Sequence, residues 1–414
     1  DDRQGEHMRQ LTVLWQAPIV VTTAVQFFET LAAARPSSLR KLHALPGSAI
    51  FLDESHAALP AKLWPQAWDW LKALSNNWGC HLILASGSLN RFWQIAEFDK
   101  DRPVIPELLD TAFRDQLNTL EKQRVVYRLH PSRFDAETLC QWLDTLPGPR
   151  LLIVNTVQSA AVIAQTIAKI KGRKHVEHLS TALMPKDRDQ TLHIIKNRLN
   201  DPDDQDWTLV ATSCVEAGVD FSFRSGLREA ASLVSLLQTA GRINRNNEYD
   251  EAVVWTIQLR KNGLLKEHPA FETSSNILLQ LFEEGKVSLE QCTFALREEV
   301  LRSSAFTDKI SKAEKSLSFK EVEQLFRVID ADTRTVVVDH DLKEQIYQNN
   351  RIDRKHFQSG CVQLWGNKVE ALKLEENARY PGLYLWNYPY DDFIGIMAGI
   401  LPTEILQLEG FAII

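Results

Sequence analysis

The sequence of 414 residues lacks several features that would place it outside the ordinary globular proteins. It has no run of about 18 apolar residues, the length that a membrane-spanning helix needs; the longest candidate, residues 393–401, is too short. Its five cysteines are scattered, with no C-x-x-C pair, and their odd number argues against a disulfide framework. We therefore expect a protein of the reducing cytoplasm.

An excess of positive charge is also absent. The net charge is −7 and the isoelectric point about 5.9, which is not the overall charge of a basic nucleic-acid-binding protein. Basic residues do gather locally, for example at Arg173 and Lys174 and at Arg242 and Arg245. An acidic protein with a local basic groove stays open, beside the simpler interpretation of these groups as solvated surface.

Short, continuous apolar runs predict the fold class. Such runs, most of them followed by polar residues, occupy 19–22, 49–52, 81–85, 151–154, 207–211 and 252–255. Strands that are apolar without alternation are typical of a parallel sheet covered on both faces. Ligands of open α/β sheets bind at the carboxyl ends of the strands. We predict an α/β fold with two parallel-sheet domains and polar sites at those strand ends.

The pattern changes twice along the chain, which predicts three domains. A polar stretch near residues 115–125 separates a first domain, 1–120, from a second, 121–260. From about residue 260 the strand–helix alternation stops. Residues 272–328 are predicted to be helices, with short strands at 335–338 and 382–386. We expect residues 261–414 to form a C-terminal α+β accessory domain.

The first candidate site is Asp53-Glu54-Ser55-His56, which follows the apolar run at 49–52. A carboxylate at the tip of a buried strand is how nucleotide hydrolases hold Mg²⁺, and a neighbouring glutamate can orient or deprotonate the attacking water. The alternative is a turn or helix cap, since Asp and Ser are common there. The functional interpretation gains weight from the motifs in the second half of the chain.

Two hydroxyl pairs also follow strand-like runs in the first half. Ser86-Gly87-Ser88 comes about thirty residues after Asp53 and could serve as a hinge at the same sheet edge, although alone it predicts a plain turn. Thr22-Thr23 could bond the phosphates of a nucleic-acid backbone, or could cap the helix that follows.

The second half contains a glycine loop and an arginine pair. Gly218 permits close backbone approach, and Asp220 could accept hydrogen bonds from a ribose. In 238–245 (Gln-Thr-Ala-Gly-Arg-Ile-Asn-Arg), Arg242 and Arg245 are three residues apart and are predicted to share one side of a helical turn. They could act on a γ-phosphate from the opposing domain; a surface helix is the alternative.

Taken together and in order, these motifs resemble those of superfamily-two DExH helicases. The variant Glu216-Ala217-Gly218-Val219-Asp220 and the tail of the chain are most similar to the CRISPR-associated helicase-nuclease of type I systems. That resemblance implies two RecA-like domains, with ATP and Mg²⁺ as cofactors. It also implies translocation on single-stranded DNA after recruitment to a crRNA-guided surveillance complex in antiviral defence.

The resemblance also implies roles for individual residues. Asp53 would hold Mg²⁺ and Glu54 would activate water, while His56, Ser86 and Ser88 would couple the ATP site to DNA. The residues implied to meet the nucleotide are Gly218, Asp220, Gln238, Arg242 and Arg245, with Arg245 as the arginine finger. The residues implied to contact the DNA backbone are Thr22, Thr23, Thr156, Ser180 and Thr212.

The sequence departs from the family in two places. No G-x-x-x-x-G-K-[ST] loop occurs, so the lysine and glycines that cradle phosphates are missing. The HD nuclease domain is missing too, and Asp339-His340-Asp341 is expected to be a solvated turn. We expect a C-terminal part of a longer protein, or a split gene whose partner chain supplies the loop, and little ATP hydrolysis by this chain alone. The alternatives are a DExH helicase acting on RNA or in repair, and a non-catalytic docking remnant.

Overall fold

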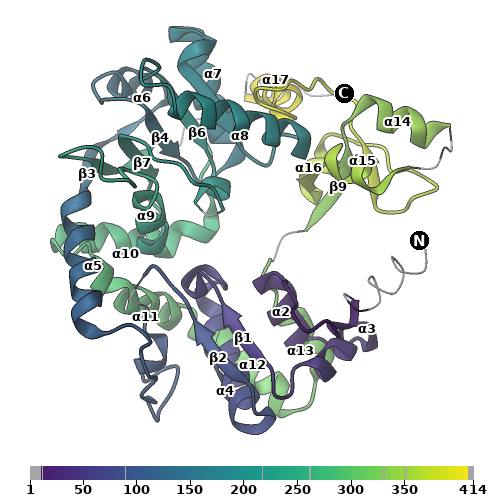
Figure 1. Cartoon of the computed structure of the whole chain (residues 1–414). Coiled ribbons are helices and arrows are strands. Elements are labelled where there is room, and N and C mark those ends of the chain that lie inside the picture. Colours follow the sequence, from purple (N-terminus) through teal and green to yellow (C-terminus); the bar gives the residue numbers. More distant parts are fainter. Residues whose placement is uncertain are drawn as a thin grey trace. The chain divides into compact units, whose positions relative to one another are not determined.

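The computed structural model describes residues 11–408 except 12, 89, 217, 261–262, 330–331, 349 and 351, together with all but four of their side chains (His56, Ser304, Ala305 and Gln407). The chain divides into two compact units, each described here by itself (Figure 1). Unit 1 takes its residues from 1–107 and 286–330, and unit 2 from 108–285 and 331–414. The predicted accessory region, 261–414, is therefore shared between the two units.

Unit 1 is built around a two-stranded parallel sheet. Strands β1 (Ala49–Leu52) and β2 (His81–Leu84) pair so that Leu52 lies beside Leu84. The helices of unit 1 come from both of its segments: α2 (Ala24–Leu31), α3 (Pro36–Leu39), α4 (Trp64–Trp78), α11 (Cys292–Arg302), α12 (Ser304–Lys315) and α13 (Phe319–Leu325). The predicted strands at 49–52 and 81–85 are thus confirmed.

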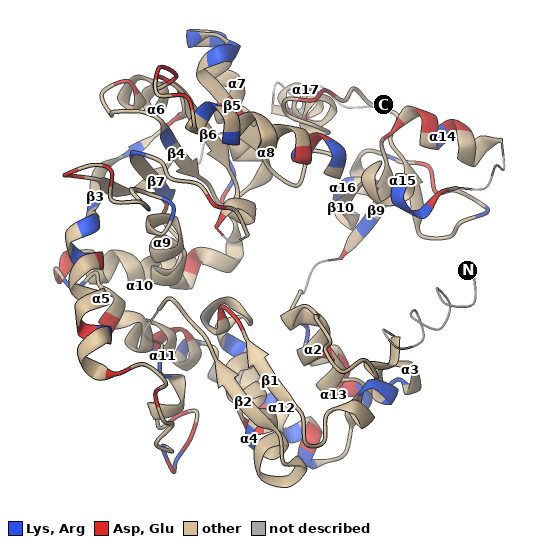
Figure 2. Ribbon diagram, viewed as in Figure 1, with Lys and Arg blue, Asp and Glu red and all other residues tan. Residues whose placement is uncertain are grey.

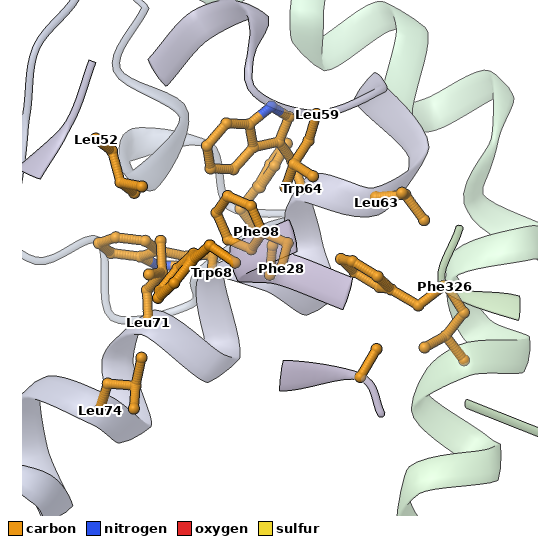
Figure 3. Packing of buried hydrophobic residues seen from close by; sticks show 14 of the residues in the cluster. Phe28, Leu52, Leu59, Leu63, Trp64, Trp68, Leu71, Leu74, Phe98 and Phe326 are labelled. Carbon is orange, nitrogen blue, oxygen red and sulfur yellow. The ribbon is translucent and has the colours of Figure 1, made fainter. Parts of the chain in front are cut away.

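The core of unit 1 is rich in aromatic side chains (Figure 3). Trp64 and Phe28 are completely buried, and Trp64 lies 4.3 Å from the ring of Phe92, measured between centroids. Phe326, which follows α13, packs against Trp70 of α4 at 4.5 Å. These contacts explain why residues after 285 join the first unit: their apolar faces complete its core.

The predicted strand at 19–22 is wrong. Among the described residues these positions belong to no sheet, and Ile19 and Val21 are 83% and 95% exposed. A β-branched apolar run has strand propensity, but a strand also needs a neighbour with which to exchange backbone hydrogen bonds. Within the described part of unit 1, the two-stranded sheet does not supply that neighbour to residues 19–22.

Unit 2 contains a six-stranded sheet in the order β3-β8-β7-β4-β6-β5, and every pairing is parallel. Its strands are β3 (Val126–Phe134), β4 (Arg150–Ile153), β5 (Val176–Leu179), β6 (Thr208–Ala211), β7 (Ser225–Glu229) and β8 (Val253–Leu259). The helices that accompany it are α5 (Thr111–Arg124), α6 (Ala136–Leu143), α7 (Val157–Lys171), α8 (Pro185–Leu199), α9 (Leu233–Ala240) and α10 (Glu272–Glu283).

Four of the six strands of this sheet are buried along their whole length. Every residue of β4, β5, β6 and β7 is buried, as the unalternating apolar runs predict for β4 and β6. The predicted α/β fold class, with a parallel sheet in each unit, is confirmed. Strand β7 was not predicted, because its sequence Ser-Gly-Leu-Arg-Glu is largely polar.

A smaller sheet, ordered β10-β9-β11, completes unit 2. Its elements are β9 (Thr333–Val337), α14 (His340–Tyr347), α15 (Arg354–Ser359), β10 (Cys361–Trp365), α16 (Gly366–Ala371), β11 (Leu383–Leu385) and α17 (Met397–Leu408). Its apolar residues share a cluster with Ala161 of α7 and with Met184, which precedes α8. Within the described residues, none of the helices has the length and apolar character of a bilayer-spanning segment.

Candidate nucleotide and nucleic-acid site

The first candidate site lies at the carboxyl end of β1 in unit 1. Asp53 and Glu54 follow the strand directly and are both exposed. The Asp53 carboxylate accepts a hydrogen bond from the Glu54 N–H at 3.0 Å, and Glu54 adopts a left-handed backbone conformation with φ of 46°. The buried Ser55 donates its N–H to the carbonyl of Ala85 at 2.9 Å, which ties this turn to the end of β2. The side chain of His56 lies outside the described part of the structure.

The Ser86–Ser88 segment is held at the same sheet edge. The Ser86 hydroxyl donates to the Ser88 carbonyl at 2.8 Å and accepts the Ser88 N–H at 3.1 Å, which closes a tight turn after β2. Helix α11 anchors the chain just after this segment, because the Thr293 hydroxyl accepts the Arg91 N–H at 2.9 Å. The turn at Asp53 and the serine segment are therefore brought together by adjacent parallel strands.

Thr22 and Thr23 lie at the start of α2. Thr23 caps this helix by accepting the Gln26 N–H at 3.1 Å, while Thr22 donates its hydroxyl to the Gln26 side chain at 2.9 Å. Both threonines are exposed. The capping role allowed by the sequence is found for Thr23, and its position at a helix N-terminus also suits contact with an anion.

In unit 2 the glycine loop and the arginine pair contact each other. Arg242 donates to the carbonyls of Val215 and Glu216, at 3.3 and 2.8 Å. Arg245 pairs with Asp220 at 3.1 Å between Nε and Oδ1, and the Asp220 side chain is 88% exposed. The two motifs are more than twenty residues apart in sequence, and the structure brings them into one site.

The predicted helical turn for the two arginines is wrong. Helix α9, which contains Gln238, ends at Ala240, and Gly241 is its C-cap. The following segment instead runs against the strand region before β7: Ile243 forms a parallel bridge with Phe223, and Asn244 has a left-handed φ of 48°. The arginines therefore reach residues 215–220 from a loop, positioned by backbone pairing.

Two glycines make this arrangement possible. A Cβ on Gly226 of β7 would lie 2.6 Å from Cγ1 of Ile243, so only glycine lets the arginine loop approach the strand. Gly218 has φ of +78°, a left-handed conformation that glycine adopts without strain. The expectation that Gly218 serves backbone geometry is consistent with this conformation.

A buried polar network, which the sequence did not predict, adjoins this site. Arg228 of β7 is completely buried, and its guanidinium lies 2.9 Å from the Glu216 carboxylate and donates to the Asn155 side chain at 2.6 Å. Glu229 accepts the Asn155 N–H at 2.6 Å. Burial raises the pKa of Glu229 to about 7, despite that hydrogen bond and the nearby Arg228. The adjacent Arg and Glu at the end of this short strand are the signal that could have revealed this network.

The remaining predicted nucleic-acid contacts follow strands β4, β5 and β6. Thr156 is half-buried and caps α7 by accepting the Ser159 N–H at 3.1 Å. Ser180 is completely buried, and its hydroxyl accepts the Ala182 N–H at 3.2 Å. Thr212 is 7% exposed, and its hydroxyl lies 3.5 Å from the thiol of Cys214. All three occupy the carboxyl edge of the sheet, but in this conformation only Thr156 has substantial exposure.

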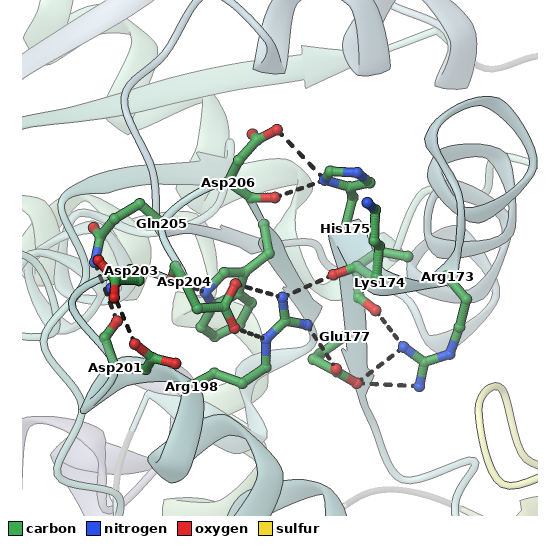
Figure 4. Close-up of polar contacts among 12 residues, drawn as sticks. Arg173, Lys174, His175, Glu177, Arg198, Asp201, Asp203, Asp204, Gln205 and Asp206 are labelled. Carbon is green, nitrogen blue, oxygen red and sulfur yellow. Dashed lines mark hydrogen bonds and ion pairs between the residues drawn. The ribbon is translucent and has the colours of Figure 1, made fainter.

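In the basic cluster around Arg173, Arg173 and Lys171 are paired with neighbouring carboxylates. Figure 4 shows Arg173 bound to Glu177, with Arg198 bridging Glu177 and Asp204. Acidic and basic residues are interspersed along the ribbon of both units (Figure 2). Arg173 is therefore more than a solvated surface group. It belongs to an ion-pair network that, through Glu177 and Arg198, holds the start of β5 to the end of α8.

Metal-binding residues do not cluster in the described part of the chain: no group of three or more His, Cys, Asp or Glu side chains is placed to hold an ion. The single Asp53 carboxylate is compatible with Mg²⁺ only where phosphate oxygens and water complete the coordination. The expectation that 339–341 is a solvated turn is wrong for Asp339, which is buried, caps α14 and pairs with Lys186 and His356.

Comparison with known families bears on the predicted resemblance. Residues 148–248 match the family model described as the C-terminal part of the CRISPR-associated nuclease/helicase Cas3. The matched segment contains the 212–220 loop and both site arginines. The resemblance predicted from the ordered motifs is therefore confirmed.

Curated relatives give the same result. The chain is 24% identical over 369 residues to a CRISPR-associated nuclease/helicase Cas3 of Haloferax volcanii, a match that covers 68% of this chain and 39% of the relative. It is 26% identical over 134 residues to the protein of that name from Methanothermobacter thermautotrophicus, covering 31% and 16%. The chain thus spans well under half of the length of these relatives.

Solved structures share the fold. The crystal structure of T. fusca Cas3 with AMPPNP aligns with a TM-score of 0.59 at 15% identity, over 92% of this chain and 57% of that one. A chain from a structure entitled CRISPR RNA-guided surveillance complex, pre-nicking, aligns with a TM-score of 0.58 at 13% identity, over 95% and 62%. At these identities the likeness is one of fold.

Proposed function

We propose that this chain, which resembles the C-terminal part of Cas3 proteins, is the motor segment of an ATP-dependent single-stranded DNA helicase in CRISPR defence. The observation that carries the proposal is the contact of Arg242 and Arg245 with the 215–220 segment, inside the region matched by the Cas3 family model. A helix with two surface arginines would not need this arrangement.

In the proposed motor the two arginines have different tasks. Arg242 holds the 215–216 backbone, so it positions the loop. Arg245 is half exposed and bound to a single exposed carboxylate, Asp220, from which a nucleotide phosphate could displace it. An arginine that stabilises the charge on a transferring phosphoryl group has this kind of accessibility. Gln238 and Gly218 complete the residues that we assign to nucleotide binding.

We assign Asp53 and Glu54 to nucleotide hydrolysis. Both carboxylates are exposed at the end of β1, where a Mg²⁺ ion carried by nucleotide phosphates could reach Asp53. The bound ion would neutralise phosphate charge. Glu54 would orient or deprotonate the water, and Ser86 and Ser88, at the same edge, would pass changes at this site to the nucleic acid. The sequence lacks a phosphate-cradling loop, so we expect this chain to need such a loop from another segment or polypeptide.

Contact with DNA is assigned to exposed groups at helix starts. Thr22 and Thr23 at α2 and Thr156 at α7 are placed to accept a phosphate backbone, and Ser180 and Thr212 position the strand ends beside Thr156. Backbone contacts grip a strand without sequence preference and weaken with salt. The proposed partner is a crRNA-guided surveillance complex, by analogy with the Cas3 relatives.

Binding of matched oligonucleotides tests this proposal. The chain is titrated into fluorescein-labelled single-stranded DNA, the RNA of the same sequence and the DNA duplex, at two salt concentrations. We expect the single-stranded DNA to bind most tightly and to lose affinity with added salt. Tighter binding of RNA would favour a helicase acting on RNA, and binding of none of the three would reject a nucleic-acid motor.

A further inference from the structure

Unit 2 contains a cavity that the proposed motor roles do not use. It has a volume of about 330 Å³ and lies at the carboxyl ends of β3, β7 and β8, beneath the segment that leads into α10. We call it the edge cavity. The lining residues that matter here are Arg133, Asn155, Glu229, Gln258, His268 and Phe271.

One wall of the edge cavity is aromatic. The rings of His268 and Phe271 lie 5.3 Å apart between centroids and are tilted by 58°. Both side chains are half-buried, and the guanidinium of Arg228 lies 5.8 Å from the Phe271 ring. Burial lowers the pKa of His268, so its ring is neutral near pH 7. A neutral, half-buried aromatic pair provides a surface on which a flat ring can stack.

The other wall is polar and fixed in place. Glu229 is 5% exposed, and one carboxylate oxygen is held by the Asn155 N–H. The Gln258 carbonyl oxygen accepts a hydrogen bond from Arg133 Nε at 3.0 Å, which orients the amide so that its NH2 group is the remaining donor. The cavity therefore combines a stacking surface with an acceptor and a donor whose positions are set before a ligand arrives.

The charge of the lining decides which part of a nucleic acid fits. Glu267 and Glu272, together with Glu229, whose pKa of about 7 leaves it partly protonated at neutral pH, line the cavity with one arginine, Arg133. A phosphate group entering this cavity would meet more negative than positive charge, whereas an uncharged heterocycle would not be repelled. Thr156, which we assign to backbone contact, is adjacent in sequence to the cavity residue Asn155, so a strand gripped there would have its bases within reach of the cavity.

We propose that the edge cavity holds one base of the bound single strand, stacked on Phe271 and His268 with its polar edge toward Glu229 and Gln258. This inference rests on the proposed function, because it requires the chain to bind single-stranded nucleic acid. A carboxylate accepts hydrogen bonds from the amino groups of cytosine and adenine. Bases with an exocyclic amino group are therefore preferred over thymine in this position.

The test distinguishes binding of a base from binding of the sugar-phosphate backbone. A fluorescein-labelled single-stranded DNA of about 12 nucleotides is compared with an oligonucleotide of equal length in which every base is replaced by an abasic tetrahydrofuran unit. Phe271→Ala should weaken binding of the base-bearing strand by about tenfold, the lower range for loss of one base–aromatic contact, and leave abasic binding unchanged. Phe294→Ala, which removes a partly exposed aromatic ring in unit 1, is the matched control and should change neither.

Every other outcome overturns the inference in a recognisable way. An equal loss on both oligonucleotides, or no loss on either, means that no base enters the edge cavity. If Phe271→Ala weakens binding of free adenosine or cytidine monophosphate but leaves binding of both oligonucleotides unchanged, the cavity takes a free nucleotide instead of a base of the bound strand. If the unaltered chain binds neither strand, the proposed function itself fails. His268→Ala repeats the test should Phe271→Ala lower the melting temperature below the assay temperature.

Discussion

Arg242 and Arg245 show how two neighbouring arginines acquire different roles from their surroundings. Arg242 donates to two backbone carbonyls, so Arg242→Ala leaves polar groups of the 215–216 loop without their partner. We expect this change to lower the free energy of unfolding by about 1–3 kcal/mol. Arg245 pairs with an exposed carboxylate, and Arg245→Ala should change stability by less than about 1 kcal/mol.

Urea unfolding of the two alanine variants measures this difference. Equal stability losses would contradict the division of roles between the two arginines. Arg242→Lys serves as the matched control, because it keeps the charge and removes the paired donors, and it should lose most of the same stability.

Glu229 predicts a dependence of stability on pH. Burial raises its pKa to about 7 from the ordinary 4.5, so the folded chain keeps a proton that the unfolded chain releases between these values. Stability contributed by the protonated carboxyl is therefore present below about pH 4.5 and is lost as pH rises to about 7, by about 3 kcal/mol in all. Glu229→Gln should remove this loss.

Comparing the stability of the unaltered chain with that of Glu229→Gln separates the effect of Glu229 from that of other titrating groups. Chemical unfolding is measured at several pH values between about 4.5 and 8 for both, and the difference between them should shrink steadily as pH falls. The buried His178, whose pKa burial lowers to about 4, acts in the opposite sense but is common to both proteins. A constant difference across this range would show that the Glu229 pKa is not raised.

The loop at residues 241–245, which carries both arginines, packs against strand β7. Gly226→Ala would place a Cβ 2.6 Å from Ile243 Cγ1. Overpacking of this kind costs about 1–3 kcal/mol and should displace the loop that carries Arg242 and Arg245. We expect lower stability and faster amide hydrogen exchange at residues 241–245.

Replacing Ile243 tests whether its contact with the new methyl group causes the loss of stability. Ile243→Ala removes the atoms that the new methyl group would meet, so the double variant should be less destabilised than the sum of the two single variants. Strict additivity would mean that the glycine is needed for another reason.

The elements also show what a sequence can predict. Strands β4 and β6 were predictable because every residue in their apolar runs is buried. Strand β7 was not, because Arg228 and Glu229 are polar and are tolerated only through Glu216 and Asn155, which lie elsewhere in the sequence. The motif residues were predictable by type and order. Their geometry was not, since Arg242 and Arg245 follow the helix and are placed by backbone pairing with residue 223.

At the scale of the whole molecule, the smaller sheet of unit 2 is joined to the large one by a charged contact. Burial alone would raise the pKa of Asp339, but hydrogen bonds from Lys186 and the Leu342 N–H outweigh it and lower the pKa to about 2. Asp339→Asn keeps the cap of α14 and removes the charge that pairs with Lys186. We expect a loss of about 1–2 kcal/mol, reduced because Lys186 is half exposed.

Amide hydrogen exchange shows which elements lose stability in Asp339→Asn. Faster exchange is expected in β9 and at the start of α8, with little change in β4 or β6. Asp341→Asn, a neighbouring exposed carboxylate, is the control and should leave the exchange pattern unaltered. Uniformly faster exchange throughout unit 2 would show that Asp339 supports general stability and not the attachment of the small sheet.

Residues 286–330 illustrate a limit of prediction at this scale. Their helices were foreseen, but their packing with residues 1–107 depends on contacts such as Phe326 with Trp70, more than 240 residues apart in sequence. Such pairing follows from the shapes of two surfaces and leaves no local pattern in the sequence. The proposed role in CRISPR defence, by contrast, was suggested by the order of short motifs alone.

ATP hydrolysis stimulated by single-stranded DNA tests the central claim most directly. The rate is measured for this chain alone and together with a polypeptide that carries a phosphate-binding loop. We predict negligible hydrolysis by the chain alone, and DNA-stimulated hydrolysis in the combination that Arg245→Ala reduces on the order of a thousandfold. Robust hydrolysis by the chain alone, or full activity of the Arg245→Ala combination, would contradict the account.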